Sequence, residues 1–419
     1  MASTKRFRAA LAVLLLAGRL TACGGGDDAG GDVTLRFSWW GNADRAALMQ
    51  QSIDLFQAAN PTITVTPSFQ EFEAYWQKMA TETAGGNAPD VLQMDFAYLR
   101  EYADRNVLLD LKKTDVRVDD LIPAFQGVGE VDGALYGVPT GGNTWCMFYN
   151  PALLAAAGVE EPAAGITWDQ YHALVDTVSK KGAGRTYGGS NYRSVIYSFE
   201  SYLLQRGGTL YTEDGALGFT EQQLIDYWTV GKQYVDDGRF IPSEKVAQIE
   251  PASPITKDLI ATEFRWDNFF ARYAAETEAE LKIGPVPVTA AGGPTGQYLK
   301  PAMLLSASAR TDHPDEAAKL ISFLINDPQV GRIFGSNRGI PATNAQREAA
   351  VLEGPALAIA EYEKAIAPLL QKAPPAPPKG AGTVEAAFLR IADEISYGRS
   401  SVPDAVDTFF TEAEDTLAG

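Results

Sequence analysis

The sequence predicts an α/β protein made of two lobes. Its 419 residues exceed what one hydrophobic core usually supports, so about two domains are expected. Segments typical of strands and helices alternate from Val33 to Met94, which indicates a parallel sheet flanked by helices. Between Gly133 and Pro151, two short strands are expected on either side of the pair Gly141-Gly142, where the chain is predicted to bend and form a hinge. An ordinary strand-to-helix connection within one large domain is the alternative interpretation of that segment.

The first predicted lobe alternates strands with helices. Strands are expected at 33–39, 63–65 and 90–94, with helices at 44–59 and 75–83 between them. Asp44 is a plausible N-cap for the first of these helices. In parallel sheets, ligands bind beyond the carboxyl ends of the strands. The aromatic, amide and acidic residues that follow these strands are therefore candidates for a ligand site: Trp40, Asn42, Glu71 and Asp95.

Most of the remaining predicted elements are helices. They are expected at 168–180, 197–205, 221–236, 314–325, 383–397 and 404–417. The run FRWDN at 264–268 is predicted to end a strand or begin a helix, and 304–309 is predicted to form a return strand. Residues 373–379, with the sequence APPAPPK, form a polyproline spacer.

The N-terminus is predicted to be a targeting segment. Residues 1–22 join a basic start to an apolar stretch and small residues before Cys23, and they resemble a bacterial lipoprotein signal peptide. That resemblance implies lipidation of Cys23, although Arg19 departs from the usual pattern and a cleaved, unlipidated signal is the alternative. Residues 23–32 would then be a flexible tether that holds the protein at the extracytoplasmic face of the cell membrane.

Composition excludes several classes of function. The formal net charge of −18 argues against a nucleic-acid partner, because phosphate binding needs clustered Lys and Arg. Cys146 is the only cysteine besides Cys23, so no intramolecular disulfide is expected, and Cys146 is predicted to be buried in its strand. His172 and His313 are expected to be surface or capping residues. The sequence contains no zinc-ligand cluster and no hydrolase or nucleotide-binding motif.

Four segments resemble the extracellular solute-binding proteins of the first family, the carbohydrate-capturing lipoproteins of bacterial ABC importers. They are FSWWGNADR, EFEAYWQKMATETAGGNAPDVLQMDFAYLREYADRNVLLDL, LYGVPTGGNTWCMFYN and KPAMLLSASARTDHPDEAAKLISFLINDPQVGRIFGSNRGIPA, in the family's order. The resemblance implies a periplasmic-binding-protein-like fold with two lobes, each a mainly parallel sheet flanked by helices and hinged by crossover segments. The implied lobes are discontinuous, with 33–140 and 304–342 in lobe I and 141–303 and 343–419 in lobe II.

The resemblance also implies a ligand site between the lobes. A sugar presents hydroxyl groups at its ring edges and CH patches on its faces, so a sugar site needs both polar side chains and flat aromatic platforms. Besides the four candidates at the strand ends of lobe I, the predicted site contains Asn143, Trp145, Tyr192, Trp266, Asp267, Asn268, Tyr298, Lys300 and Arg338. Trp39 is expected to point into the core, and Trp76, Trp168 and Trp228 are expected to pack on helix faces.

The function implied by the resemblance is the capture of a mono- or oligosaccharide and its delivery to the transmembrane subunits of an ABC permease. The implied protein is a monomer without a cofactor, a catalytic residue or a metal. Three alternatives remain open: a binding protein of the same fold for a glycerol phosphate, polyol or metal chelate, a glycoside hydrolase, and a surface adhesin. A hydrolase would use a carboxylate pair such as Glu71 with Asp95. A phosphate ligand would have only Lys300, Arg338 and Arg193 as cationic candidates.

Overall fold

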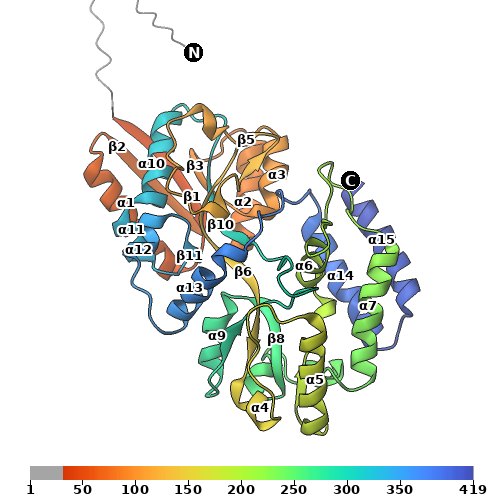
Figure 1. Ribbon diagram of the computed structural model, residues 1–419. Coiled ribbons are helices and arrows are strands. Elements are labelled where there is room, and N and C mark those ends of the chain that lie inside the picture. The colour runs from red at the N-terminus through yellow and green to blue at the C-terminus, as the bar shows by residue number, and fades with distance from the viewer. Residues whose placement is uncertain (1–31, 419) are drawn as a thin grey trace, which may run out of the picture.

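The computed structural model describes residues 32–418, so the predicted signal peptide and Cys23 lie outside the described residues. The chain forms two lobes joined by long strands (Figure 1). A nine-stranded mixed sheet runs through both lobes, and seven of its strands follow one another in the spatial order β2 (Ile63–Gln70), β1 (Val33–Trp40), β3 (Val91–Met94), β10 (Leu299–Ala307), β6 (Val138–Tyr149), β8 (Ile260–Trp266) and β7 (Tyr187–Gly189). The predicted two-lobed α/β fold is confirmed.

The strand pairs near the two ends of this sheet are parallel, and the pairs that involve the crossing strands are antiparallel. β1 pairs parallel with β2 and β3 in lobe I, and β7 pairs parallel with β8 in lobe II. The crossing strands β6 and β10 pair antiparallel with each other and with their neighbours β8 and β3. The short strands β9 (Lys282–Gly284) and β11 (Ile340–Pro341) add to β6, and β4 (Glu130–Val131) and β5 (Ala134–Leu135) form a separate pair.

Lobe I packs its helices around the β2-β1-β3 side of the sheet. These helices are α1 (Ala43–Ala59), α2 (Phe72–Ala84), α3 (Phe96–Asp104), α10 (Pro314–Asn326), α11 (Pro328–Phe334) and α12 (Asn344–Ala349). Its core contains fully buried apolar side chains such as Phe37, Met94 and Leu305. Burial of these side chains supplies most of the driving force for folding of the lobe.

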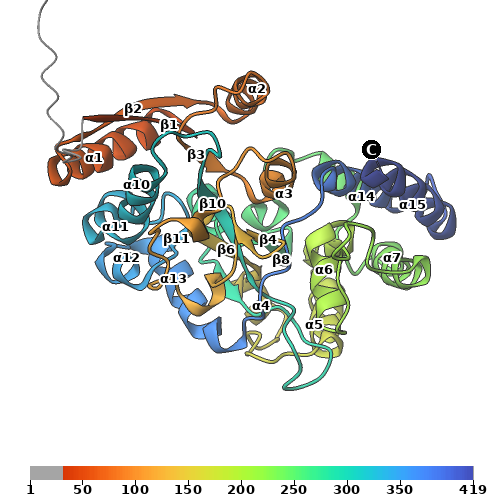
Figure 2. The same ribbon diagram turned by 90° about the horizontal axis from the view of Figure 1, so that it is seen from above.

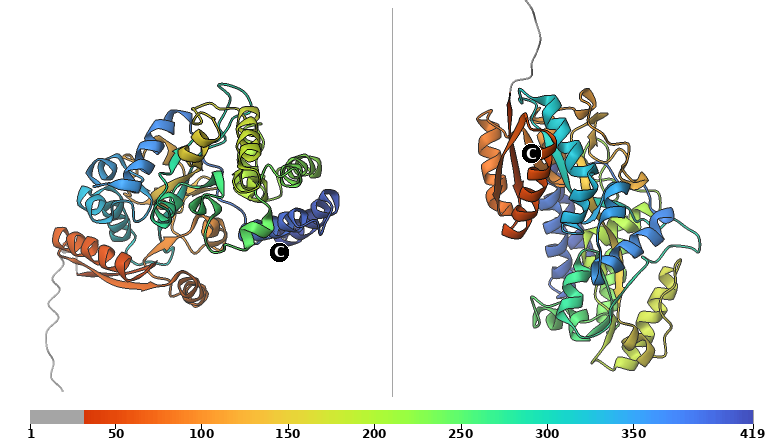
Figure 3. Two further views of the ribbon diagram at one scale, coloured as in Figure 1. Left: turned by 90° about the horizontal axis from the view of Figure 1, so that it is seen from below. Right: turned by 90° about the vertical axis from the view of Figure 1, so that its left-hand side faces the viewer.

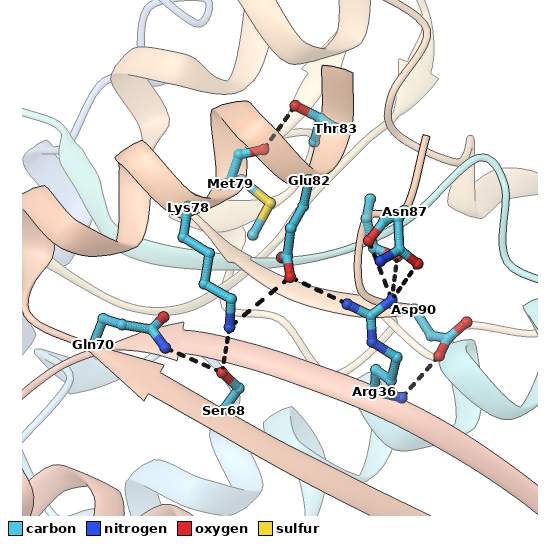
Figure 4. Close-up of polar contacts among 10 residues, drawn as sticks. Arg36, Ser68, Gln70, Lys78, Met79, Glu82, Thr83, Asn87 and Asp90 are labelled. Atoms are coloured by element: carbon cyan, nitrogen blue, oxygen red, sulfur yellow. Dashed lines mark hydrogen bonds and ion pairs between the residues drawn. The ribbon is translucent and has the colours of Figure 1, made fainter. Parts of the chain in front are cut away.

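A polar network ties α2 to the two outer strands (Figure 4). Arg36 on β1 places its guanidinium 3.3 Å from Glu82 and donates to Asn87 at 3.0 Å. Lys78 on α2 donates to the Ser68 hydroxyl of β2 at 2.7 Å. The network holds α2 against the middle of β1 and the carboxyl end of β2.

Lobe II contains a sheet half and a helical half. Its helices are α4 (Pro151–Ala156), α5 (Trp168–Gly182), α6 (Ile196–Leu204), α7 (Glu221–Asp236), α8 (Ser243–Ala247), α9 (Phe269–Glu276), α13 (Gly354–Ile366), α14 (Ala381–Ser396) and α15 (Val402–Ala418). α6, α7, α14 and α15 share a core of buried residues that includes Phe199, Tyr227, Phe388 and Phe409. α14 and α15 lie at the opposite side of the molecule from α1 (Figures 2 and 3).

The polyproline segment 373–379 forms a further connection between the lobes. It follows α13 and leads to α14, yet Ala373 and Ala376 are buried in the core of lobe I. Arg100 on α3 donates to the Ala376 carbonyl at 3.3 Å. The segment therefore docks on lobe I before the chain enters the C-terminal helices of lobe II.

The crossover at Gly141-Gly142 differs from the prediction. β6 runs without interruption for 12 residues through both glycines, and it stays paired with β10 and β11 there. A Cβ atom at Gly141 would lie 2.6 Å from the Arg338 carbonyl oxygen, and one at Gly142 would lie 2.7 Å from the Lys300 carbonyl oxygen. Close approach of neighbouring backbones therefore explains the glycines. The prediction of two short strands was wrong, because β6 is one strand, and the irregularity at this point is a register shift of β10 between Pro301 and Met303, opposite the glycine pair.

Other boundaries shift by a few residues. The N-cap of α1 is Asn42, whose Oδ1 accepts from the Arg45 N–H at 3.0 Å, and not Asp44. The return strand β10 begins at Leu299, five residues before the predicted start. Trp39 and Cys146 are buried as predicted, and Cys146 is a free thiol. Within residues 32–418, no helix combines the length and the apolar character that a membrane span requires.

Candidate functional site

Four aromatic rings meet where the crossing strands enter lobe II. Trp145 on β6 and Trp266 on β8 are register partners, so their side chains lie on one face of the antiparallel pair, with ring centroids 5.4 Å apart. Tyr197 of α6 lies 4.9 Å from Trp266, and Tyr298, directly before β10, lies 6.4 Å from it. Trp145 and Tyr298 are buried, whereas Trp266 and Tyr197 are half-buried and present ring surface. We call these four residues the aromatic cluster.

Lys300 lies against the aromatic cluster. Its Nζ is 3.0 Å from the Tyr197 hydroxyl, 4.7 Å from the centroid of that ring and 5.2 Å from the Trp266 ring centroid. The Tyr197 hydroxyl donates to Glu385 on α14 at 2.7 Å, and the Tyr298 hydroxyl donates to Glu200 on α6 at 2.6 Å. The cluster thus has one cation and two carboxylates at its edges.

Burial raises the pKa of two carboxyl groups near Lys300, those of Asp95 and Glu200. Burial raises the pKa of Asp95, while the hydrogen bond from the Ala97 N–H at 2.8 Å and the Lys300 cation oppose that rise. Burial also raises the pKa of Glu200, and the Tyr298 hydroxyl and Lys300 again oppose it. One lysine therefore supports two carboxylates, one at the start of α3 in lobe I and one in lobe II.

Two cavities border the aromatic cluster. The first, called here the aromatic cavity, has a volume of about 390 Å³ and is lined by Trp145, Tyr197, Trp266 and Glu385 among others. The second, the interlobe cavity, has a volume of about 90 Å³. It is lined by Phe96 of lobe I together with Tyr197 and Lys300, and by the polyproline segment. The cluster therefore faces both a lobe II cavity and the space between the lobes.

The match to a family model identifies what kind of protein carries this site. Residues 51–359, more than half of the chain, match the bacterial extracellular solute-binding proteins. The chain belongs to this family. The predicted resemblance is confirmed.

Solved structures and curated relatives support the same assignment. An extracellular solute-binding protein of family 1 from Alicyclobacillus acidocaldarius is 29% identical, with a TM-score of 0.79 over 94% of this chain and 100% of that chain. An oligogalacturonide-binding protein from Yersinia enterocolitica shares the fold at 22% identity, with a TM-score of 0.79 over 92% of this chain and 99% of its own. A putative binding protein from Brucella abortus is 24% identical over 70% of this chain and 71% of its own length.

Six of the predicted site residues of this solute-binding protein come together around Lys300. They are Trp145, Trp266, Tyr298, Lys300 itself, Asn143, which is the register partner of Lys300, and Asp95, which interacts with it electrostatically. Two of them lie on β6, one on β8, and two at the start of β10. The crossing strands thus position most of the site.

Three predicted residues lie at the strand ends of lobe I. Trp40 is 8% exposed, because Phe72, Tyr75 and Trp76 surround its ring at centroid distances of 5.5, 5.3 and 5.9 Å. Asn42 is exposed and caps α1. Glu71 is exposed directly before α2. Phe72, at 42% exposure, offers more aromatic surface here than Trp40 does.

Burial separates three further candidates from the solvent-facing surface. Tyr192 is 3% exposed and stacks on Trp168 in the core of lobe II, with ring centroids 5.1 Å apart. Arg338 is 3% exposed; its Nη2 donates to the Leu324 carbonyl at 3.3 Å, and its Nε and Nη1 have no hydrogen-bond partner. Burial lowers the pKa of Arg338 to about 9. Arg338 would have to move before a ligand could reach it, whereas the Tyr192 ring forms part of the wall of a lobe II cavity.

Asp267 is fully buried at the lobe junction, whereas its neighbour Asn268 is exposed. Its Oδ2 accepts from the Thr144 N–H of β6 at 2.9 Å. Its Oδ1 and the Oε1 of Glu363 on α13 are buried and have no hydrogen-bond partner. Burial raises the pKa of Asp267 well above its ordinary value, and the neighbouring Glu363 carboxyl adds to that rise. Burial raises the pKa of Glu363 to about 7, against the effect of Arg347, whose Nη2 lies 2.8 Å from Oε2. Asp267 therefore supports the crossover.

Sequence reasoning missed three residues of the site. Tyr197 and Glu200 lie one helical turn apart on α6 and face the cluster together, a spacing that could have indicated a shared face. Glu385 comes from α14, which follows the polyproline segment, and it contacts Tyr197 from 188 positions away in sequence. No local pattern marks that contact.

The histidine and the thiol that could serve as a base or a nucleophile lie outside the two cavities. Within residues 32–418 no group of three or more His, Cys, Asp or Glu side chains could hold a metal ion. His172 was predicted at the surface, but it is half-buried with Nε2 3.1 Å from the Tyr192 hydroxyl, and burial lowers its pKa to about 4. The Cys146 thiol is fully buried, and its burial raises its pKa. Neither group is placed to act on a ligand in a cavity.

Proposed function

We propose that this protein is the substrate-binding component of a carbohydrate ABC importer. It binds a sugar at the aromatic cluster without changing it chemically, and it presents the closed complex to the transmembrane subunits of a permease. The observation that carries the proposal is the half-buried pair Trp266 and Tyr197, which line the aromatic cavity together with Glu385, while Lys300 lies against both rings and lines the interlobe cavity. A related fold in Yersinia enterocolitica is named for oligogalacturonide binding, which also supports a sugar ligand.

The energetics of sugar binding explain why both kinds of side chain are needed. Micromolar affinity requires about 8 kcal/mol, whereas one net hydrogen bond contributes roughly 0.5 to 1.5 kcal/mol. Lys300, Glu200, Glu385 and Asp95 supply charged hydrogen-bonding groups. Contact of apolar ring faces with Trp266 adds buried area, which offsets part of the cost of ordering the ligand.

Closure of the two lobes is the proposed mechanism of capture. Lys300 connects Asp95 of lobe I electrostatically to the aromatic cluster, so a sugar at Lys300 lies within reach of groups on both sides. A ligand that contacts both lobes favours the closed state through its higher affinity for that state. We further propose lipidation at Cys23, anchoring at the extracytoplasmic face of the membrane, and a monomeric protein with the two lobes that the resemblance implies, except that α12 is assigned to lobe I.

The test is a thermal-shift screen of mono- and oligosaccharides on the mature chain, followed by calorimetry with the best ligand. Binding to the native state alone raises the melting temperature. Trp266→Ala should then weaken binding by about tenfold or more, and Trp266→Phe, which keeps an aromatic ring, should lose less. Equal affinity of the wild type and Trp266→Ala would remove Trp266 from the site.

The rival functions give different results in the same experiments. Release of reducing ends from an oligosaccharide would indicate a glycoside hydrolase. A shift only with glycerol phosphate or a polyol would identify a non-sugar solute. Absence of any saturable small-ligand binding would favour an adhesin.

A further inference from the structure

A second cavity of lobe II adjoins the aromatic cavity. It has a volume of about 350 Å³ and continues along α14 to Leu389, Asp393 and Tyr397, and we call it the α14 groove. Five residues line both the α14 groove and the aromatic cavity: Val195, Val246, Glu250, Arg265 and Glu385. The two cavities therefore form one elongated depression that starts at Trp266.

The α14 groove combines apolar surface with polar edges. Leu389 is 47% exposed and offers apolar surface in the groove. Val195 and Val246 add aliphatic surface, while Asn191 donates from Nδ2 to the Ser396 hydroxyl at 3.2 Å along the rim. Aliphatic walls with a few amide and hydroxyl groups match the faces and edges of a sugar ring.

Most of the charged residues that line the α14 groove are acidic, which disfavours a negatively charged ligand. Glu250, Glu385 and Asp393 line it, and among residues 32–418 none of these three carboxylates forms an ion pair. Arg265, the one basic residue that lines it, is held 3.0 Å from Glu263. An anionic sugar would be repelled there, whereas an uncharged one would not.

The size of the depression sets the length of the ligand. Each of the two cavities lies near the lower end of the range of about 300 to 1,000 Å³ that small-molecule sites occupy. A ligand confined to the aromatic cavity would leave the α14 groove filled with water. We infer, given the carbohydrate function proposed above, that the ligand is an uncharged oligosaccharide longer than a disaccharide. Its chain continues from Trp266 into the α14 groove, where Leu389 packs against a distal ring.

Calorimetry with neutral oligosaccharides tests the length of the ligand. The probes are the gluco- and xylo-oligosaccharide series from the disaccharide to the hexasaccharide, titrated into the mature chain. In the series that binds, affinity should rise by at least about tenfold beyond the disaccharide, because further rings bury area in the groove. Affinity that does not change with chain length would overturn the inference and leave the proposed function intact. Absence of binding by any saccharide would overturn both.

A matched pair of variants tests the position of the distal ring. Leu389→Trp fills the α14 groove, and Leu357→Trp makes the same change on α13, at a leucine of 43% exposure outside both cavities. Leu389→Trp should abolish the gain for longer chains and leave disaccharide affinity unchanged, while Leu357→Trp should alter neither. Equal losses for short and long ligands in Leu389→Trp, or no loss, would refute the assignment. An unchanged melting temperature of the free variant confirms that it folds.

A charge change tests the exclusion of acidic sugars. The wild type should bind trigalacturonate at least about tenfold more weakly than the best neutral trisaccharide. The double variant Glu250→Gln with Asp393→Asn should reduce that difference. Tighter binding of trigalacturonate than of every neutral chain by the wild type would overturn the inferred ligand class.

Discussion

Replacing Glu363 by Gln should remove a loss of stability that the wild type shows as pH rises. Burial beside Asp267 raises the pKa of Glu363 from its usual 4.5 to about 7. Between these values the folded protein holds a proton that the unfolded chain releases, so stability falls as pH rises through this window and levels off above about pH 7. Since one pKa unit corresponds to about 1.4 kcal/mol, the wild type should lose about 3 kcal/mol of stability over this range.

Gln at position 363 resembles the protonated form of Glu363 at every pH. Its amide can donate to Asp267 Oδ1, and its oxygen can still accept from Arg347. Urea denaturation at pH values from 5 to 8 measures the effect. The stability of Glu363→Gln should fall by about 3 kcal/mol less than that of the wild type over this range, and the pH dependence that remains comes from Asp267, whose buried carboxyl also has a raised pKa. Glu361→Gln, an exposed change on the same helix, should follow the wild type. Parallel pH profiles for the wild type and Glu363→Gln would show that the Glu363 carboxyl does not lose a proton in this pH range.

Three further changes test other parts of the structure. Gly142→Ala should destabilise the protein by about 1 to 3 kcal/mol, because its Cβ would meet the Lys300 carbonyl oxygen and the Phe125 ring. A variant that melts at the same temperature as the wild type would argue against close packing at the crossover. Arg338→Met should raise stability by about 1 to 3 kcal/mol in urea denaturation, because Nε and Nη1 are buried without partners; a large loss would mean that the cation has an essential role. Lys300→Met removes the cation that lowers the pKa of Asp95, so a larger fraction of Asp95 should be protonated at pH 5 than in the wild type. Sugar affinity measured by calorimetry should therefore fall more at pH 5 than at pH 7, and equal losses at both pH values would exclude this coupling.

Local signals in the sequence were sufficient for much of the fold. The predicted helix 221–236 matches α7, whose Thr220 caps it and whose end is followed by Gly238 in the left-handed region. Trp145 and Trp266 were both selected from short aromatic runs, and strand pairing places them side by side. Signals of this kind depend on a few adjacent residues, which makes them visible in one sequence.

Contacts between distant segments were not visible in the same way. Tyr192 and Arg338 look like polar site residues, yet both are buried. Tyr192 packs against Trp168 of α5, and Arg338 packs against α10 and α11. The glycine pair in β6 looked like a flexible joint, but its small residues allow neighbouring backbones to approach. In each case the deciding partner lies on another element of the fold.

The shared ladder of β6 and β10 affects how the molecule can open. Backbone pairing extends from Leu299 opposite Thr144 to Leu305 opposite Val138, with register shifts between Pro301 and Leu304, and β11 also pairs with β6 at the glycines. The junction is therefore a paired ribbon and not a set of loose linkers. Such a ribbon deforms by torsion along its length more easily than by folding at one point, since folding would break several hydrogen bonds at once. The free and liganded molecules should therefore differ by a modest screw-like rotation, with a correspondingly small change in radius of gyration in X-ray scattering.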